Sequence, residues 1–347
     1  MSDTTYRAGI IGLGFIGGGD QVSGDRIGQI VAKLDGTHRE ALSKNPRIEL
    51  VAGCDLDAGR RERFTETTGA TTYDNWQAMV ENERLDIVSI ATTAPAHCAL
   101  TVGCAEAGVR AVYCEKPVAT SIVEAEQMIA ACKAADALLV VNHNRRFNPN
   151  YRELRDRIAA GQLGELTSVS LRWSSGRLGC VGTHLVDAAR MLTGREIVAV
   201  SATLDLAEKA DCRGDEFHDP GGWGVMRMED GLPIVINASN YAVGPAEIII
   251  EGTDARAYTG GDEVIIRTFD GQEETLPGRR AEATSMDRTL GEIVDWLDSP
   301  GEFSTPAEQA LKTFEAMIAF HVSHRNNAAW TELPMAGDDR EYRIVAG

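Results

Sequence analysis

The sequence predicts an α/β protein with two domains, a doubly wound parallel sheet followed by a domain with a large, mostly antiparallel sheet. A chain of 347 residues is too long for one typical core. Strand and helix patterns alternate up to about residue 145, which is typical of a parallel sheet covered by helices. From residue 166 onward, strand patterns follow one another across turn signals such as Asp230-Gly231 and Asp270-Gly271. We therefore expect domains at residues 1–145 and 146–347.

Composition narrows the class of partners. The chain has 52 acidic and 34 basic residues, a formal charge of −18 and a pI near 4.8, which argues against general nucleic-acid or anionic-membrane binding. Its seven cysteines show no paired or metal-like spacing, which predicts free thiols in a reducing compartment and no metal site. No run reaches about 18 apolar residues, and the N-terminus lacks an apolar signal region. We expect a cytoplasmic protein with no nucleic-acid or membrane partner.

A short apolar strand beginning at Ala8 runs into glycines spaced G-x-G-x-x-G. Such glycines permit a tight turn and let the backbone approach a pyrophosphate at a helix N-terminus. The candidate dinucleotide contacts in this loop are Gly12, Gly14, Phe15, Ile16 and Gly17.

The second strand, Ile48–Cys54, ends at Asp55. A carboxylate there accepts hydrogen bonds from the adenosine ribose and repels a 2′-phosphate, which favours NAD over NADP. Arg60 and Arg61 follow closely and weaken that preference. The alternative role for Asp55 is to cap the helix that starts near Ala58.

The segment between Gly17 and Asp55 is much longer than the usual spacing of about 20 residues. The excess, residues 18–36, contains Ile27, Ile30, Val31 and Leu34 at helical spacing and predicts an extra short helix. Thr37 and Glu40 then predict a capping box for the usual helix. The insertion either covers the cofactor or active-site mouth, or forms a surface or oligomer contact.

Two later strands of the first domain also end in polar residues. The strand Asp86–Ala91 leads into a turn and a helix, where small hydroxyl side chains could line the nicotinamide ribose, and where His97 is better explained as a structural residue. The candidate cofactor contacts here are Ala91, Thr92, Thr93, Pro95 and His97.

The strand Ala111–Cys114 stops at Glu115-Lys116-Pro117. Ligands of open α/β sheets bind at the carboxyl ends of the strands, so Lys116 can meet a small molecule while its stem stays packed. Glu115 and Lys116 also count as candidate cofactor contacts. The alternative is a solvated pair of loop charges.

In the second domain, glycines precede a predicted helix that carries Thr183, His184 and Asp187. His184 and Asp187 are three residues apart and share one helix face. Histidine is the natural acid–base near neutral pH, and the alternative is a capping or core histidine. Asp187 either orients His184, binds a substrate hydroxyl or is structural.

Further substrate candidates each have a packing alternative. Asn144 and Arg146, with His143, either line the substrate or serve interdomain packing. Trp173, Arg177 and Trp223 either offer a stacking face for a sugar ring or, for Trp173, belong to the core.

Taken together, these motifs resemble the Gfo/Idh/MocA family of sugar and cyclitol oxidoreductases, over nearly the whole chain. The resemblance rests on Gly12–Gly17, Asp55, Glu115-Lys116-Pro117, Arg146-Phe147-Asn148-Pro149, Gly182–Asp187, Ser323-His324-Arg325 and Leu333-Pro334. It implies an N-terminal Rossmann domain, a C-terminal α/β domain with a mostly antiparallel sheet, a bound nicotinamide cofactor and a cis Lys116–Pro117 peptide. It also implies a homodimer or homotetramer.

The chain departs from its family at one site position. Many members carry an aspartate four residues before the histidine, whereas this chain has Cys180. A thiol is a weak hydrogen-bond partner that is normally uncharged at neutral pH. The resemblance therefore carries over Lys116 and His184 as the catalytic pair, without the middle acid.

The sequence thus predicts an NAD(H)-dependent enzyme that moves a hydride between nicotinamide and a secondary alcohol or ketone of a sugar or cyclitol. His184 takes the hydroxyl proton, and Lys116 stabilises the developing alkoxide. Two alternatives stay open: a non-catalytic dinucleotide-binding sensor, and an enzyme that shuttles hydride between two sugars on a retained cofactor.

Overall fold

A computed structural model describes residues 4–174, 176–206, 214, 217–238 and 246–345. The chain divides into two compact units. Unit 1 comprises the residues up to Ala119 together with Glu124–Asn142 and Ala283–Glu308, and unit 2 comprises Thr120–Val123, His143–Glu282 and the residues from Gln309 onward. Apart from residues 120–123, the chain passes from unit 1 to unit 2 between Asn142 and His143, whereas the sequence motifs put the boundary after residue 145. Residues 283–308 also belong to unit 1, which no sequence motif predicted.

Unit 1 is built on a six-stranded parallel sheet with the order β3-β2-β1-β4-β5-β6. Its strands are β1 (Tyr6–Ile11), β2 (Ile48–Cys54), β3 (Thr71–Tyr73), β4 (Ile87–Ile90), β5 (Ala111–Cys114) and β6 (Leu138–Val141). The strand order reverses between β1 and β4, which is the point where ligands bind in doubly wound sheets. Every residue of β4, β5 and β6 is buried, as expected for strands covered on both faces.

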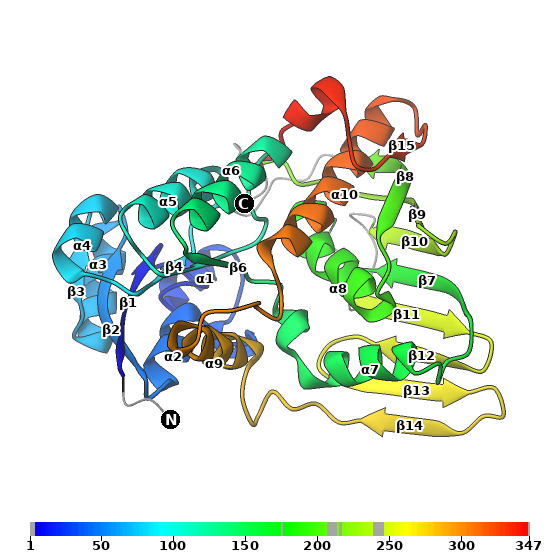
Figure 1. Cartoon of the computed structure of the whole chain (residues 1–347), viewed down its shortest axis with the longest axis horizontal. Coiled ribbons are helices and arrows are strands. Elements are labelled where there is room, and N and C mark those ends of the chain that lie inside the picture. The colour runs from blue at the N-terminus through cyan, green and yellow to red at the C-terminus, as the bar shows by residue number, and fades with distance from the viewer. Residues whose placement is uncertain (1–3, 175, 207–213, 215–216, 239–245, 346–347) are drawn as a thin grey trace. The chain divides into compact units, whose positions relative to one another are not determined.

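Helices cover both faces of this sheet, with α5 and α6 on one side and α2 and α9 on the other (Figure 1). The helices are α1 (Gln21–Arg26), α2 (His38–Lys44), α3 (Ala58–Thr68), α4 (Trp76–Glu83), α5 (Ala94–Glu106), α6 (Ile122–Ala134) and α9 (Ser285–Asp298). Local caps set several starts, because the side chains of Thr37, Asp57 and Asn75 each accept a backbone N–H in the first turn.

The insertion contains the extra short helix that was predicted, but the apolar spacing of Ile27, Ile30, Val31 and Leu34 placed it too far along the chain. Helix α1 instead begins at the Asp20 cap and ends at Arg26, and residues Val31–Lys33 form only a 3₁₀ turn. Gly28 adopts a φ of +67°, which a continuing right-handed helix does not allow. Ile30 is 49% exposed, so the apolar residues are not the buried face of a helix.

The rejoining of residues 283–308 to unit 1 is explained by contacts between α9 and the region before α2. Ser285 N donates to the Asp35 carboxylate, and a Cβ on Gly36 would lie 2.7 Å from the Thr284 hydroxyl. Thr284 and Asp287 form a capping box that starts α9. The far end of α9 is held by Asp298, which binds Tyr6 and Arg47.

Unit 2 contains a nine-stranded sheet with the order β14-β13-β12-β11-β7-β10-β9-β8-β15. Its strands are β7 (Leu166–Arg172), β8 (Ile197–Asp205), β9 (Gly221–Met228), β10 (Pro233–Ala238), β11 (Glu247–Gly252), β12 (Ala255–Thr259), β13 (Val264–Thr268), β14 (Glu273–Leu276) and β15 (Thr331–Glu332). All neighbours are antiparallel except β7 and β10. The expectation of a mostly antiparallel sheet is confirmed.

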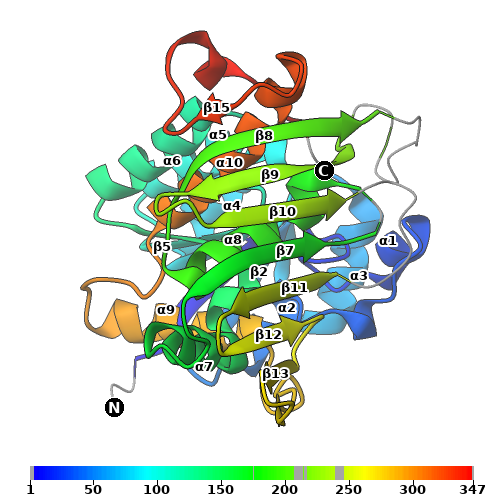
Figure 2. The same cartoon turned by 90° about the vertical axis from the view of Figure 1, so that its right-hand side faces the viewer.

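Helices α7 (Pro149–Ala159), α8 (Thr183–Thr193) and α10 (Ala307–Arg325) lie along one face of this sheet (Figure 1). Figure 2 looks onto the opposite face, where β9 and β10 run side by side. Trp223 on β9 is 50% exposed and Val235 on β10 is 46% exposed. The sequence pattern missed β12, β14 and β15.

Within the described part of the chain, no helix combines the length and apolarity needed to span a lipid bilayer. The six described cysteines form no disulfide, and Cys212 lies outside the described residues.

Candidate active site

The glycine loop after β1 is shaped so that only glycine fits at two positions. Gly12 has a φ of +95°, and a Cβ there would lie 2.5 Å from the Ala91 carbonyl oxygen. A Cβ on Gly17 would lie 1.9 Å from the Gly12 carbonyl oxygen. The loop is therefore bare backbone at the switch point of the sheet, and it fits the pyrophosphate of a dinucleotide. Phe15 and Ile16, which lie between the glycines, are partly exposed.

Asp55 sits directly beside this loop. Its Oδ2 accepts a hydrogen bond from Leu13 N at 2.8 Å, and its Oδ1 accepts one from Asp57 N at 2.9 Å. The Nη1 of Arg60 lies 3.4 Å from Oδ2. The cap of α3 is Asp57, so the capping alternative belongs to that residue and leaves the Asp55 carboxylate facing the loop.

The contacts of His97 favour its structural interpretation. Its ring is fully buried, with Nδ1 2.9 Å from the Pro117 carbonyl oxygen and Nε2 3.1 Å from the Thr92 carbonyl oxygen. Burial lowers the pKa of the imidazole, which favours the neutral ring. His97 thus ties the loop after β4 to the loop after β5. Nearby, Ala91 is buried, Thr92 is partly exposed, and Thr93 and Pro95 are exposed at the start of α5.

Glu115 is not a solvated loop charge, because it is only 4% exposed. Its Oε1 accepts a hydrogen bond from Asn142 Nδ2 at 2.6 Å and lies 3.1 Å from His38 Nε2. Its Oε2 accepts one from Lys116 N at 3.2 Å. Burial alone would raise the pKa of this carboxyl, but the His38 hydrogen bond and the Lys116 charge bring it down to about 2.

Lys116 therefore follows a buried, ionised carboxylate at the carboxyl end of β5. The lysine itself is partly exposed, and its peptide bond to Pro117 is cis, as the resemblance implied. The sequence motifs missed His38 and Asn142, which contact Glu115, and Tyr113, whose ring packs on His38 and whose hydroxyl donates to Asn142. Asn142 follows β6, so its place at a strand end is the only signal that could have found it.

In unit 2, a π-helical turn, η3 (Leu178–Gly182), runs directly into α8. Such turns are frequent at functional sites. Thr183 is buried at the start of α8, and His184 follows it with its side chain partly exposed. The ring of His143 meets that of His184 edge-on, with 6.0 Å between the ring centroids.

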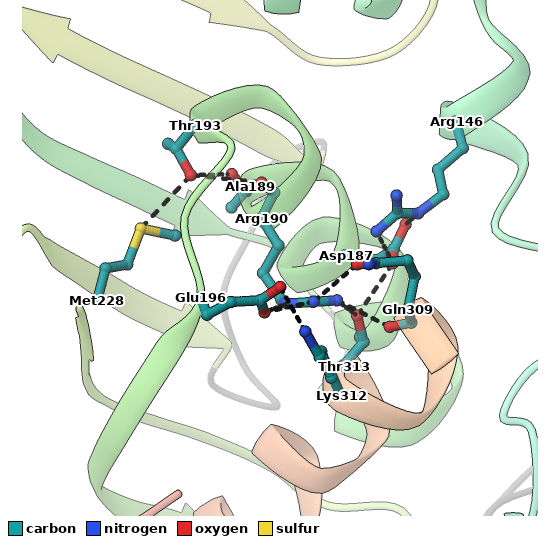
Figure 3. Close-up of polar contacts among 10 residues, drawn as sticks. All are labelled: Arg146, Asp187, Ala189, Arg190, Thr193, Glu196, Met228, Gln309, Lys312 and Thr313. Atoms are coloured by element: carbon teal, nitrogen blue, oxygen red, sulfur yellow. Dashed lines mark hydrogen bonds and ion pairs between the residues drawn. The ribbon is translucent and has the colours of Figure 1, made fainter. Parts of the chain in front are cut away.

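Asp187, on the same helix, is fully buried, and its carboxylate is hydrogen-bonded (Figure 3). It accepts hydrogen bonds from Arg146 Nε at 2.7 Å and Nη2 at 2.8 Å, and from Thr313 Oγ1 at 3.0 Å. Burial by itself would raise the pKa of this carboxyl, but the charges of His143 and Arg146 hold it below its ordinary value. Arg146 is thereby committed to an ion pair, which favours its packing role over substrate binding.

Cys180 contacts two charged residues, Arg177 through its thiol and Asp219 through its backbone N–H. Arg177 Nη2 lies 3.3 Å from the Cys180 thiol, and the Asp219 carboxylate accepts hydrogen bonds from Gly179 N at 2.7 Å and Cys180 N at 2.8 Å. Asp219 lies before β9, with no motif around it, so the sequence offered no signal for this contact. A carboxylate from elsewhere in the chain thus holds the turn that leads to His184.

Two further candidates differ in exposure. Trp173 is 1% exposed and donates from Nε1 to the Gly176 carbonyl at 2.5 Å, so its core alternative describes it and it offers no open stacking face. Asn144 begins a 3₁₀ turn, Asn144–Phe147, and is partly exposed.

Comparison with known proteins agrees with these features. A family model described as "Oxidoreductase family, NAD-binding Rossmann fold" matches residues 6–143, and one described as "GFO/IDH/MocA C-terminal domain" matches residues 151–258. The chain belongs to the Gfo/Idh/MocA family. It is an NAD-dependent oxidoreductase, and its first domain is the NAD-binding Rossmann fold that the glycine loop and Asp55 predicted.

Relatives of this Gfo/Idh/MocA oxidoreductase act on cyclitols and sugars. An inositol 2-dehydrogenase of Rhizobium meliloti (strain 1021) is 30% identical over 69% of this chain and 70% of that protein. Inositol 2-dehydrogenase 3 of Saccharopolyspora erythraea is 28% identical over 85% of both chains. The solved structure of a levoglucosan dehydrogenase with NADH and levoglucosan shares the fold, with a TM-score of 0.79, 19% identity, and coverage of 96% of this chain and 100% of that one.

Proposed function

We propose that this oxidoreductase uses Lys116 and His184 to oxidise a secondary alcohol of a sugar or cyclitol, or to reduce the corresponding ketone. The observation that carries the proposal is the order of strands in unit 1. The glycine loop follows β1 and Lys116 follows β5, and β4 is the one strand between them. Because all three strands are parallel, their carboxyl ends meet at one edge of the sheet, which supports a role for the lysine beside a dinucleotide bound at the glycine loop.

The nucleotide end of the site supplies binding and orientation. The bare backbone at Gly12, Gly14 and Gly17 takes the pyrophosphate, and Asp55 takes the adenosine ribose hydroxyls. Bound NAD supplies the hydride acceptor.

Lys116 acts on the reacting oxygen. As an ammonium, its side chain donates a hydrogen bond to the substrate hydroxyl and stabilises the negative charge that develops there. The buried Glu115 carboxylate that precedes it is ionised and carries the opposite charge. His184 accepts the hydroxyl proton on an imidazole nitrogen during oxidation and returns it during reduction.

The proposal is tested by mixing the protein and NAD with a panel of sugars and cyclitols and following NADH absorbance. Wild type is expected to turn over at least one polyol, while Lys116→Ala and His184→Ala lose about 10²–10⁴ in kcat. NADH binding, measured by fluorescence, should persist in His184→Ala. If either variant keeps full turnover, that residue has no catalytic role. If wild type binds NADH but oxidises no sugar or cyclitol in a broad panel, the proposed substrate class is wrong.

We also propose that the chain forms a homodimer or homotetramer through the exposed face of the unit 2 sheet, in a reducing cytoplasm. Trp223 on β9 and Val235 on the neighbouring strand β10 are each about half exposed. Such apolar side chains on one face of a sheet are unusual if that face stays in contact with water. Light scattering after gel filtration tests this, because Trp223→Glu should lower the measured mass to that of one chain. An unchanged mass would place the interface elsewhere.

A further inference from the structure

The inserted residues 18–36 lie against the nucleotide edge of unit 1. Helix α1 packs on the glycine loop, since a Cβ on Gly24 would lie 3.0 Å from the Phe15 ring. The other neighbour of this loop is the Arg60 guanidinium, whose Cζ would lie 3.5 Å from a Cβ on Gly14. Arg60 therefore lies over the glycine loop and beside Asp55, at the place proposed for the adenosine ribose.

A chain of hydrogen bonds runs from the insertion to Arg60. The Ser23 hydroxyl, on α1, accepts a hydrogen bond from Arg60 Nε at 3.1 Å and donates one to the Asp20 carboxylate at 2.6 Å. Ser23 is only 7% exposed, so water competes little for these contacts. With Nη1 of Arg60 directed at Asp55, two sides of the guanidinium are already occupied.

The anchor of this chain is rigid. Asp20 is held by Arg63 through two bonds of 2.9 Å, from Nε and Nη2, and it also caps α1 through Ser23 N. Burial alone would raise the pKa of Asp20, but its bonds to Arg63 and Ser23 lower it to about 2, so it stays ionised at neutral pH. Both ends of the chain, Arg63 and Arg60, lie on α3, and the insertion connects them.

NADP differs from NAD by a phosphate on the 2′-hydroxyl of the adenosine ribose, and an arginine near the ribose acid is what accommodates that phosphate in related folds. We propose that the insertion is part of the nucleotide site and enforces the preference for NAD, because Ser23 holds Arg60 where its fork cannot turn to a 2′-phosphate. Released from Ser23, Arg60 gives the site an anion partner that offsets repulsion by Asp55. The inference rests on the proposed role of Asp55.

The test measures dissociation constants of NADH and NADPH by fluorescence titration of the full chain. Wild type should bind NADPH at least about tenfold more weakly than NADH, and Ser23→Ala should reduce that ratio by about tenfold. In Ser23→Ala/Arg60→Ala the ratio should return to the wild-type value or rise above it, because the phosphate partner is gone.

Two matched control variants distinguish the release of Arg60 from a general loss of structure in the insertion. Ser23→Ala/Arg61→Ala should keep the gain in NADPH affinity, because Arg61 Nη1 donates to the backbone carbonyls of Asp55 and Leu56. Gln21→Ala, which removes bonds to Asp25, Gln29 and Val31 inside the insertion, should leave the ratio unchanged.

The proposal is wrong if Ser23→Ala binds NADH normally and the ratio of its NADPH and NADH dissociation constants is unchanged. It is also wrong if the gain in NADPH affinity persists in Ser23→Ala/Arg60→Ala. A wild type that prefers NADPH overturns it as well. A wild type that binds neither nucleotide contradicts the proposed function itself, so the two failures are distinguishable.

Discussion

Each unit buries one carboxylate close to a proposed catalytic residue, and the two are stabilised in different ways. Glu115, beside Lys116, is surrounded by an amide, an imidazole and a backbone N–H. Asp187, one helical turn after His184, is held by a two-bond ion pair with Arg146. The amide and the backbone N–H beside Glu115 are neutral donors, whereas the guanidinium beside Asp187 is always charged. Removing Asp187 therefore leaves the buried Arg146 guanidinium without its ion-pair partner, whereas removing Glu115 leaves no buried guanidinium unpaired.

The largest effect is expected for Asp187→Ala, which leaves the Arg146 guanidinium buried without its partner. Removing one member of a buried ion pair costs about 3–5 kcal/mol of unfolding free energy. Urea denaturation followed by circular dichroism measures it. The control, Arg146→Met/Asp187→Leu, removes both charges and should recover most of the loss. A cost below about 1 kcal/mol for Asp187→Ala would mean that solvent reaches Arg146 easily.

Glu115 should make stability depend on acid. Its pKa is lowered from 4.5 to about 2 in the folded protein, so the stability it contributes is present above pH 4.5 and is lost as the pH falls toward about 2. The shift corresponds to roughly 3 kcal/mol. Denaturation midpoints of wild type and Glu115→Gln, measured at a series of pH values, should differ near neutrality and converge in acid. A constant difference across that range would contradict an ionised Glu115.

Asp219→Ala should have the next largest effect, since it leaves Gly179 N and Cys180 N without their acceptor at the start of the helix that carries His184. Unsatisfied buried donors cost about 1–3 kcal/mol. We expect a lower melting temperature and a reduced kcat, with an unchanged dissociation constant for NADH, because the nucleotide site lies in unit 1. Equal losses of kcat and NADH affinity would point to general unfolding instead.

The smallest effect is expected at a helix cap in unit 1, which serves as a comparison for Asp219. The Asn75 side chain accepts a hydrogen bond from Ala78 N at 2.9 Å at the start of α4, and Asn75 is exposed. Asn75→Ala should cost only about 1 kcal/mol by thermal denaturation and leave kcat unchanged. A fall in kcat would show that stability alone can lower turnover, and it would weaken the interpretation of Asp219→Ala.

Features that depend on neighbouring residues were predictable. The cap at Thr37 and the glycine loop followed from side-chain capping and the tight turn. The extra helix of the insertion was expected but placed too far along the chain, because apolar spacing was weighed without the positive φ that Gly28 allows. Short strands such as β14, exposed at three of its four residues, carried too little apolar pattern to be found.

The sequence by itself determined the dinucleotide loop, its acid, the lysine at the end of β5 and the helix that carries His184. These features arise from interactions between residues a few positions apart. Tertiary structure alone decided the partners of the buried charges. His38 and Glu115 are 77 residues apart, Asp187 and Thr313 are 126 apart, and Asp219 reaches Cys180 across 39. Burial removes water as an alternative partner, so each charge must bind whichever polar group the packed strands and helices bring to it.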